Sequence, residues 1–182
     1  MKALVIYGTR WGGTVKIAES IEQVLTKEGF DVDIIDAKKK RKILSSSYEL
    51  FIVGSGIRAD KWTKETINFL QENAELLKTK RVALFVSCQM VERQDQAREN
   101  AKKQYLENVA EQHGFSPVSL GYFGGFLDFH KSHGLIVDIM IRVNRKSLRR
   151  NGLDTTKVHD TRDWNKIEIW AHEVAKAVSN KK

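Results

Sequence analysis

The stretch YGTRWGGT, residues 7–14, joins the apolar run KALVIY, residues 2–7, to an amphipathic segment. The apolar run predicts a buried strand. The spacing of the apolar residues in 14–28, at i, i+3 and i+4, predicts a helix. A loop rich in glycine and threonine between a strand and a helix N-terminus presents backbone N–H groups that can hold an anion. We therefore expect an anion-binding loop here.

Neither of two common nucleotide-binding motifs fits this loop. Gly8 and Gly13 have the glycine spacing of a P-loop, but Thr14 follows directly where that motif requires lysine. Gly8, Gly12 and Gly13 do not supply the G-x-G-x-x-G dinucleotide fingerprint either. The loop instead offers hydroxyls at Thr9 and Thr14 beside flexible backbone, which suits a single phosphate monoester. The simpler alternative is a turn in which Thr14 only caps the helix.

The bulk composition is typical of one soluble globular domain. The chain has 182 residues, of which 41% are hydrophobic, and it contains four tryptophans and one proline. This length can bury a sizeable core, so we expect residues 1–182 to form a single domain. The single cysteine, Cys88, excludes an intramolecular disulfide and fits a reducing compartment. With no signal peptide and no apolar run near the roughly 18 residues of a membrane span, we expect a cytoplasmic protein.

Strand and helix patterns alternate along the chain. We expect strands at 2–7, 32–35, 50–54, 82–87 and 118–123, and helices at 14–28, 63–77, 95–113, 135–149 and 163–178, the last capped by Asp160 or Thr161. This alternation predicts βαβ units and a parallel sheet covered on both faces. In such sheets, ligands bind beyond the carboxyl ends of the strands. Three loops follow strands on that edge: residues 8–14, 54–62 and 87–94.

The first loop and its flanks resemble the flavodoxin family. The residues Val5-Ile6-Tyr7-x-Thr9-x-x-Gly12-x-Thr14-x-x-x-Ala18-x-x-Ile21 meet every position of that family's phosphate-loop pattern. Gly54-Ser55-Gly56-Ile57-Arg58 and Ser87-Cys88-Gln89 lie where the second and third flavin loops of the family would be. The resemblance implies an α/β fold, a flavodoxin-like doubly wound sheet of five parallel strands in the order 2-1-3-4-5. It also implies one noncovalently bound FMN, whose phosphate is the expected anion.

Within this fold, the chain looks most similar to the quinone-dependent protoporphyrinogen oxidases. The similarity rests on GSGIR at residues 54–58, TRDW at 161–164, and the long segment of about 124–162 between the fifth strand and the last helix. It implies an FMN-dependent oxidoreductase of heme biosynthesis that passes electrons from a reduced porphyrin to a quinone. Two alternatives stay open: an electron-carrier flavodoxin that shuttles electrons between redox proteins, and an NAD(P)H:quinone reductase.

The resemblance assigns the first loop to the FMN phosphate, through Thr9, Arg10, Gly12, Gly13 and Thr14. Arg10 either makes a charge-assisted contact with the phosphate or points to solvent. Trp11 either shields the cofactor or packs on the first helix. The sequence leaves both pairs of alternatives open.

The resemblance assigns the other two loops to the flavin, through Ser55, Gly56, Ile57, Arg58, Ser87, Cys88 and Gln89. Glycine tolerates positive φ and leaves the backbone of the second loop free to reorient. The third loop has no aromatic residue where classical flavodoxins usually stack a tyrosine, so we expect a flavin face open to a substrate. Cys88 is expected to be a small buried residue rather than a redox thiol. No side chain is expected to act as a catalytic base.

His130 and His133, near Asp128, are the candidate metal ligands of the chain. No cysteine or glutamate completes a ligand set beside them, so we expect no metal. We expect both histidines to lie exposed at the mouth of the flavin site instead.

The segment 135–150 combines an apolar first half with a strongly basic second half. It contributes much of the net charge of +8 through Arg142, Arg145, Lys146, Arg149 and Arg150. The helix expected here either packs into the core with a solvated basic end, or lies on the inner face of a membrane with its arginines at anionic headgroups. The same arginines could instead bind porphyrin propionates. No motif supports nucleic-acid binding. Because classical electron-carrier flavodoxins are acidic, the positive charge favours the enzyme.

Overall fold

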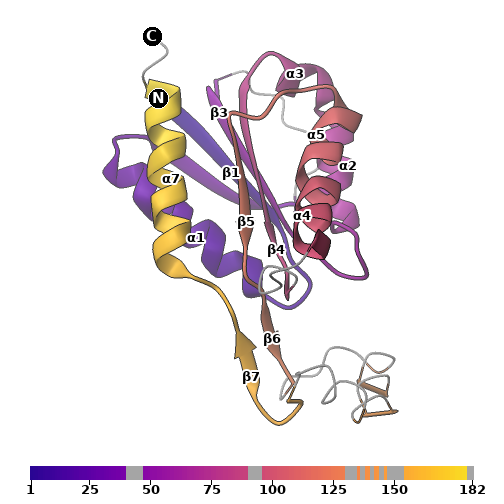
Figure 1. Cartoon of the computed structure of the whole chain (residues 1–182). Coiled ribbons are helices and arrows are strands. Elements are labelled where there is room, and N and C mark those ends of the chain that lie inside the picture. The colour runs from indigo at the N-terminus through magenta and orange to yellow at the C-terminus, as the bar shows by residue number, and fades with distance from the viewer. Residues whose placement is uncertain are drawn as a thin grey trace.

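The central sheet of the computed structural model contains five parallel strands in the order β2-β1-β3-β4-β5 (Figure 1). The structure describes residues 1–39, 47–89, 96–129 and 154–179, together with residues 135, 138, 139, 142, 143 and 146. The strands are β1 (Lys2–Gly8), β2 (Asp31–Asp36), β3 (Leu50–Gly56), β4 (Arg81–Ser87) and β5 (Ser119–Phe123). The predicted fold class and strand order are confirmed.

Helices cover both faces of this sheet. On one face lie α1 (Gly13–Lys27) and α7 (Trp164–Ser179), and on the other lie α2 (Lys64–Glu72), α3 (Ala74–Lys78), α4 (Gln96–Lys102) and α5 (Asn108–His113) (Figure 1). Successive side chains of a strand point to opposite faces. Ala3 and Val5 of β1 therefore join the core beneath α1 and α7, whereas Leu4 and Ile6 join the core beneath the other helices.

Two helices that the sequence predicts as continuous are interrupted. The expected helix 63–77 is divided at Asn73, whose buried side-chain amide donates a hydrogen bond to the carbonyl oxygen of Phe69 at 2.8 Å. The expected helix 95–113 contains a π-helical segment, Lys103–Glu107, between α4 and α5. The apolar spacing runs through both interruptions, so periodicity alone predicts single helices.

The predicted cap of the last helix is wrong. Asp163 Oδ1 accepts a backbone N–H of the first turn of α7 at 3.1 Å, so Asp163 is the capping side chain. Asp160 instead forms an ion pair with Arg162, and Thr161 exchanges backbone and side-chain hydrogen bonds with Gly125. The side chains of Asp160 and Thr161 therefore form their bonds outside the helix.

Between β5 and α7, the chain forms two short antiparallel strands that the sequence does not predict. They are β6 (Phe126–Asp128) and β7 (Val158–Asp160), and they form an arm beyond the carboxyl edge of the main sheet (Figure 1). Strands of three residues carry too little alternation to be recognised from sequence.

Several predictions fall wholly or partly outside the described residues. His130, His133, residues 90–94 of the third loop and most of the segment 135–150 lie there. The positions of 135–150 that the structure describes, residues 135, 138, 139, 142, 143 and 146, have helical backbone.

Candidate functional site

The carboxyl ends of the strands bring the three predicted loops together. In the parallel register, Gly8 of β1 lies opposite Ser55 of β3, and Gly56 lies opposite Ser87 of β4. Backbone pairing continues beyond the strands, because the N–H of Ile57 donates to the carbonyl oxygen of Ser87 at 3.0 Å. The sheet edge therefore fixes the loops relative to one another.

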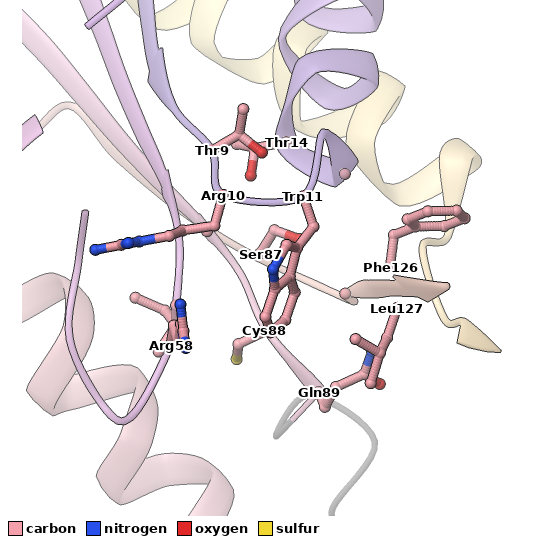
Figure 2. A pocket seen from close by; sticks show the side chains of 14 residues that line it. Thr9, Arg10, Trp11, Thr14, Arg58, Ser87, Cys88, Gln89, Phe126 and Leu127 are labelled. Atoms are coloured by element: carbon pink, nitrogen blue, oxygen red, sulfur yellow. The ribbon is translucent and has the colours of Figure 1, made fainter. Parts of the chain in front are cut away.

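A cavity lies between these loops (Figure 2). The predicted site residues that line it are Thr9, Arg10, Trp11, Gly13, Thr14, Gly56, Ile57, Arg58, Ser87, Cys88 and Gln89. Two predicted residues are not among those that line it: Gly12 forms the turn before α1, and the hydroxyl of buried Ser55 accepts the N–H of Thr63 at 2.9 Å. The cavity holds about 70 Å³, below the roughly 300–1,000 Å³ typical of small-molecule sites. It therefore encloses only part of a nucleotide-sized ligand.

The first loop turns sharply before α1. Thr9 Oγ1 accepts the N–H of Gly12 at 2.9 Å, and Gly12 has a φ of 82°, which favours glycine. The helix begins at Gly13, and Thr14 is buried within its first turn, so the alternative of Thr14 as the helix cap is wrong. The first turn of α1 has neither a side-chain cap nor an acidic residue. Its N–H groups therefore suit an external anion.

Protein atoms approach one another closely around the cavity. A Cβ at Gly56 would lie 2.9 Å from Thr14 Oγ1, and one at Gly125 would lie 3.0 Å from Gln89 Nε2. Within the described structure, the buried Nε2 atom of Gln89 has no hydrogen-bond partner. An unpartnered buried donor is unfavourable by about 1–3 kcal/mol, and a ligand acceptor in the cavity would relieve this.

Among the described residues that line the cavity, Gly125, Phe126 and Leu127 were not predicted from the sequence. They precede or belong to β6, which packs directly on the first loop, since a Cβ at Gly13 would lie 2.9 Å from the Cβ of Phe126. The third loop contributes no aromatic side chain to the cavity, whereas β6 contributes Phe126 and Leu127 (Figure 2).

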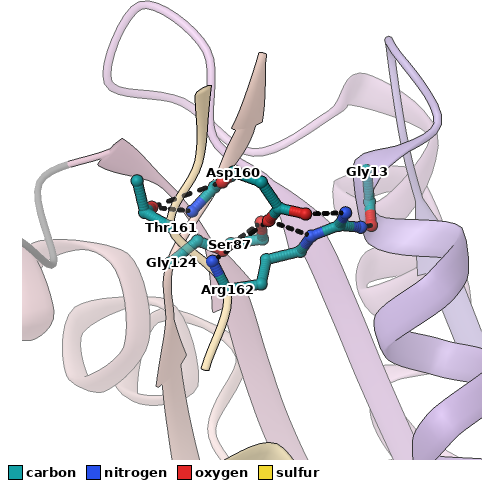
Figure 3. A network of polar contacts seen from close by, with 7 residues as sticks. Gly13, Ser87, Gly124, Asp160, Thr161 and Arg162 are labelled. Carbon is teal, nitrogen blue, oxygen red and sulfur yellow. Dashed lines mark hydrogen bonds and ion pairs between the residues drawn. The ribbon is translucent and has the colours of Figure 1, made fainter. Parts of the chain in front are cut away.

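A polar network anchors the β6–β7 arm to the first loop (Figure 3). Arg162 Nη1 donates to the carbonyl oxygen of Gly13 at 3.1 Å, while Nε and Nη2 donate to the two carboxylate oxygens of Asp160 at 2.7 and 2.6 Å. The guanidinium carbon also lies 4.6 Å from the ring centroid of Phe126 and 4.7 Å from that of Trp164. The hydrogen bonds from Arg162 lower the pKa of the Asp160 carboxyl group. The ion pair therefore persists at neutral pH.

Two further hydrogen bonds complete this network. The N–H of Gly125 donates to Thr161 Oγ1 at 3.0 Å, and Ser87 Oγ donates to the carbonyl oxygen of Gly124 at 2.9 Å (Figure 3). The resemblance assigns the Ser87 hydroxyl to the flavin, and in the structure this hydroxyl donates to the segment that links β5 and β6.

Positive charge and aromatic surface meet at the mouth of the cavity. The guanidinium carbon of Arg58 lies 5.4 Å from the ring centroid of Trp11, and both side chains line the cavity. Arg10 is exposed and extends away from Thr9 and Thr14 (Figure 2). Cys88 is 5% exposed, which agrees with its expected burial.

Among the residues that the structure describes, no cluster of His, Cys, Asp and Glu side chains is arranged to hold a metal ion. That part of the chain also has no helix with the length and apolar character needed to cross a membrane.

The fold and the site define a flavodoxin-like α/β protein with a cavity at the switch point of the strand order, where ligands bind in such sheets. Residues 4–150 match the sequence profile described as "Flavodoxin domain", and the chain belongs to this family. Membership of the family implies flavin binding and a role in oxidoreduction or electron transfer.

Three relatives illustrate the similarity. The chain is 24% identical to the protoporphyrinogen IX dehydrogenase (quinone) of Leishmania major, over 96% of this chain and 74% of that protein. It is 23% identical to the protoporphyrinogen IX dehydrogenase (quinone) of Escherichia coli strain K12, over 96% and 95%. The structure of oxidised Flavodoxin 1 from Bacillus cereus superposes with a TM-score of 0.59 at 17% identity, over 97% of this chain and 98% of the other. The last comparison supports the fold.

Proposed function

We propose that the chain is an FMN-dependent oxidoreductase of the quinone-linked protoporphyrinogen dehydrogenase type. It passes electrons from a reduced porphyrin to a quinone. The observation that carries this proposal is a similarity over 96% of the chain to two proteins named for that activity. The net charge of +8 supports it further, since classical electron carriers of this fold are acidic.

The first loop supplies the phosphate site in this proposal. The N–H groups of the first turn of α1 lie at the positive end of its dipole, where a phosphate is stabilised. The Thr9 hydroxyl accepts the Gly12 N–H and keeps its own proton to donate to the phosphate. Thr14 offers a second hydroxyl from the cavity wall. Arg58 adds positive charge at the mouth.

The other lining residues orient and enclose the flavin in this proposal. FMN supplies the redox chemistry when bound, and the chain supplies position and electrostatics. The unpartnered amide of Gln89 donates to a polar edge of the flavin, and Ile57 packs against its ring. Phe126 and Leu127 exclude water from the side next to the β6–β7 arm.

We also propose that the segment 135–150 contacts the membrane that holds the quinone. Leu135, Ile139 and Val143 follow one another at i, i+4 and i+8, and they are 79%, 52% and 75% exposed. Arg142 and Lys146 are exposed beside them. Exposed apolar side chains next to basic ones suit the surface of an anionic bilayer. A helix buried in the core would not leave these side chains exposed.

The test is anaerobic mixing of the FMN-loaded protein with protoporphyrinogen IX, followed at the visible absorbance of the flavin. Bleaching that a menaquinone analogue reverses is the expected result. Reduction by a ferredoxin or flavodoxin reductase but not by the porphyrinogen would reject the enzyme in favour of the carrier. Reduction by NAD(P)H alone would favour the quinone reductase. Failure to retain FMN would reject all three.

A further inference from the structure

A second cavity, of about 710 Å³, lies next to the first one. Its volume falls within the roughly 300–1,000 Å³ of small-molecule sites. Arg10, Gly56 and Arg58 line both cavities, so a ligand in the second would adjoin the cofactor site. We propose that this cavity binds an amphipathic organic carboxylate, an apolar molecule with negatively charged carboxylate groups, which is the electron donor of the reaction.

The rim of the second cavity is strongly basic. Among the residues that the structure describes, Arg10, Arg58, Lys61 and Lys64 are the cationic side chains that line it. Asp60 is the acidic residue among the described lining residues, and its Oδ1 accepts a hydrogen bond from the hydroxyl of Tyr105 at 2.6 Å. A concave surface with this excess of positive charge concentrates anions near it.

Apolar side chains form part of the wall of the cavity, beside the polar residues Thr63, Gln104 and Gln112, and they restrict the kind of anion. Trp62, Tyr105 and Val109 line it and are 7%, 3% and 9% exposed in the whole structure. Ile67 of α2 adds a further aliphatic side chain. Small inorganic anions gain nothing from such a surface. A molecule with an apolar body and carboxylates at one end uses both the wall and the rim.

The turn that carries two of the cations has an unusual backbone. Arg58 and Lys61 exchange backbone hydrogen bonds of 3.0 and 3.1 Å. Between them, Ala59 and Asp60 have φ values of 47° and 58°, a region that residues other than glycine rarely adopt. Such a conformation persists where the surrounding structure holds it, and it is most common at functional sites.

Tyr105 holds this turn on both sides. Its hydroxyl donates to Asp60, and its carbonyl oxygen accepts the indole N–H of Trp62 at 2.7 Å. Burial and the hydrogen bond to Asp60 raise the pKa of the Tyr105 phenol, so the hydroxyl stays a donor at neutral pH. Tyr105 belongs to the π-helical segment Lys103–Glu107, and π-helical turns frequently mark functional sites. The turn thus keeps Arg58 and Lys61 at the rim of the cavity.

This inference rests on the proposed function for the identity of the electron donor. The reduced porphyrin of that proposal is an apolar ring system with two carboxylates, which matches the apolar wall and the basic rim. Arg58 lines both cavities and so marks the boundary between the donor site and the cofactor site.

The test measures binding of protoporphyrin IX and of its dimethyl ester to the FMN-loaded protein, by the change in porphyrin fluorescence. The test variant is Lys61→Gln/Lys64→Gln, whose substituted side chains line the second cavity and not the first. The matched control is Lys27→Gln/Lys176→Gln, which removes the same charge from exposed positions on α1 and α7. We expect the test variant to bind the diacid about tenfold more weakly, equivalent to ~1.4 kcal/mol of charge-assisted contacts. The control should bind it like the wild type.

Equal affinity of the test and control variants for the diacid would overturn the proposal. Equally tight binding of the dimethyl ester would overturn it too, because the ester carries no negative charge. Binding that depends on Lys61 and Lys64, without flavin reduction by the porphyrinogen, would uphold the site and reject the proposed function. Reduction of the flavin by the porphyrinogen, with porphyrin binding unchanged in the test variant, would uphold the proposed function and reject this binding site.

Discussion

Arg162 and Gly13 are joined by a hydrogen bond of 3.1 Å from Nη1 to the carbonyl oxygen, although they lie at opposite ends of the chain. The Arg162 side chain is 7% exposed and also holds Asp160 and the ring of Phe126. The carbonyl belongs to the residue that begins α1, in the loop that we assign to the phosphate. The β6–β7 arm and the first loop are therefore parts of one anchored structure.

Replacing Arg162 by lysine should lower both the stability of the fold and its affinity for FMN. Lysine keeps the charge but lacks the planar fork that contacts Gly13 and Asp160 together. We expect the free energy of unfolding to fall by about 1–3 kcal/mol, and FMN affinity to fall by about tenfold. Urea unfolding and fluorescence titration with FMN measure the two effects. Arg142→Lys, at an exposed position, is the control and should change neither quantity.

The ion pair between Arg162 and Asp160 predicts a specific pH dependence. Hydrogen bonds from Arg162 hold the pKa of the Asp160 carboxyl group below its ordinary value of 3.8. Because the folded-state pKa is lowered, the stabilisation is complete above the ordinary pKa and is lost as pH falls through the folded-state value. The difference in unfolding free energy between wild type and Asp160→Asn should be constant near neutral pH and shrink below about pH 4. A difference that persists unchanged in acid would show that ionisation of Asp160 contributes nothing.

Local patterns were sufficient to predict the sheet and the loops that follow β1, β3 and β4. β1, β3 and β4 each contain a continuous apolar run, and parallel topology places the loops that follow such strands at one edge. The lining of the first cavity by residues such as Thr14, Ile57 and Gln89 follows from that topology. That these residues contact FMN stays a prediction.

The contacts of the arm could not be predicted in the same way. The motif TRDW, residues 161–164, stands out in the sequence, but its roles depend on partners distant along the chain. Thr161 bonds Gly125, and Arg162 bonds Gly13. The second cavity depends on positive φ values at Ala59 and Asp60, which no glycine signals in advance. Tertiary contacts, not local preference, select these features.

Gly56 should couple energetically to Thr14. A Cβ at Gly56 would lie 2.9 Å from the Thr14 hydroxyl oxygen, while the next nearest atom is the carbonyl oxygen of Gly8 at 3.9 Å. Gly56→Ala should therefore lower the free energy of unfolding by about 1–3 kcal/mol through overpacking. In a Thr14→Ala background, the same change should be nearly neutral. Urea unfolding of the four proteins in this cycle measures the coupling, and additive effects would contradict the close approach.

Gln89 should affect stability and cofactor binding in opposite directions. Its buried Nε2 lacks a partner in the described part of the chain, so Gln89→Met should raise the stability of the flavin-free protein by about 1 kcal/mol. The same substitution removes the donor that we assign to the flavin. FMN affinity should then fall by about tenfold. Thermal unfolding without FMN and titration with FMN separate the two effects. A variant that loses both stability and affinity would indicate a structural role for the amide.

Contact with a membrane should depend on both the basic and the apolar exposed side chains that the structure describes in residues 135–150. Each basic side chain near an anionic surface contributes about 1 kcal/mol, so Arg142→Gln/Lys146→Gln should weaken binding to phosphatidylglycerol vesicles by about thirtyfold. Leu135→Ser/Val143→Ser should weaken binding to the same vesicles by removing the two most exposed apolar side chains of this segment that the structure describes.

Co-sedimentation with vesicles of defined composition distinguishes the apolar from the electrostatic contribution. Neutral phosphatidylcholine vesicles should bind the wild type weakly, because they offer no attraction for Arg142 and Lys146. The Lys27→Gln/Lys176→Gln protein lowers the total charge equally and should bind like the wild type, since its substitutions lie on α1 and α7. If this control loses as much affinity as Arg142→Gln/Lys146→Gln, the attraction comes from net charge alone. The segment 135–150 would then have no specific role in docking, and the quinone would have to reach the flavin by another route.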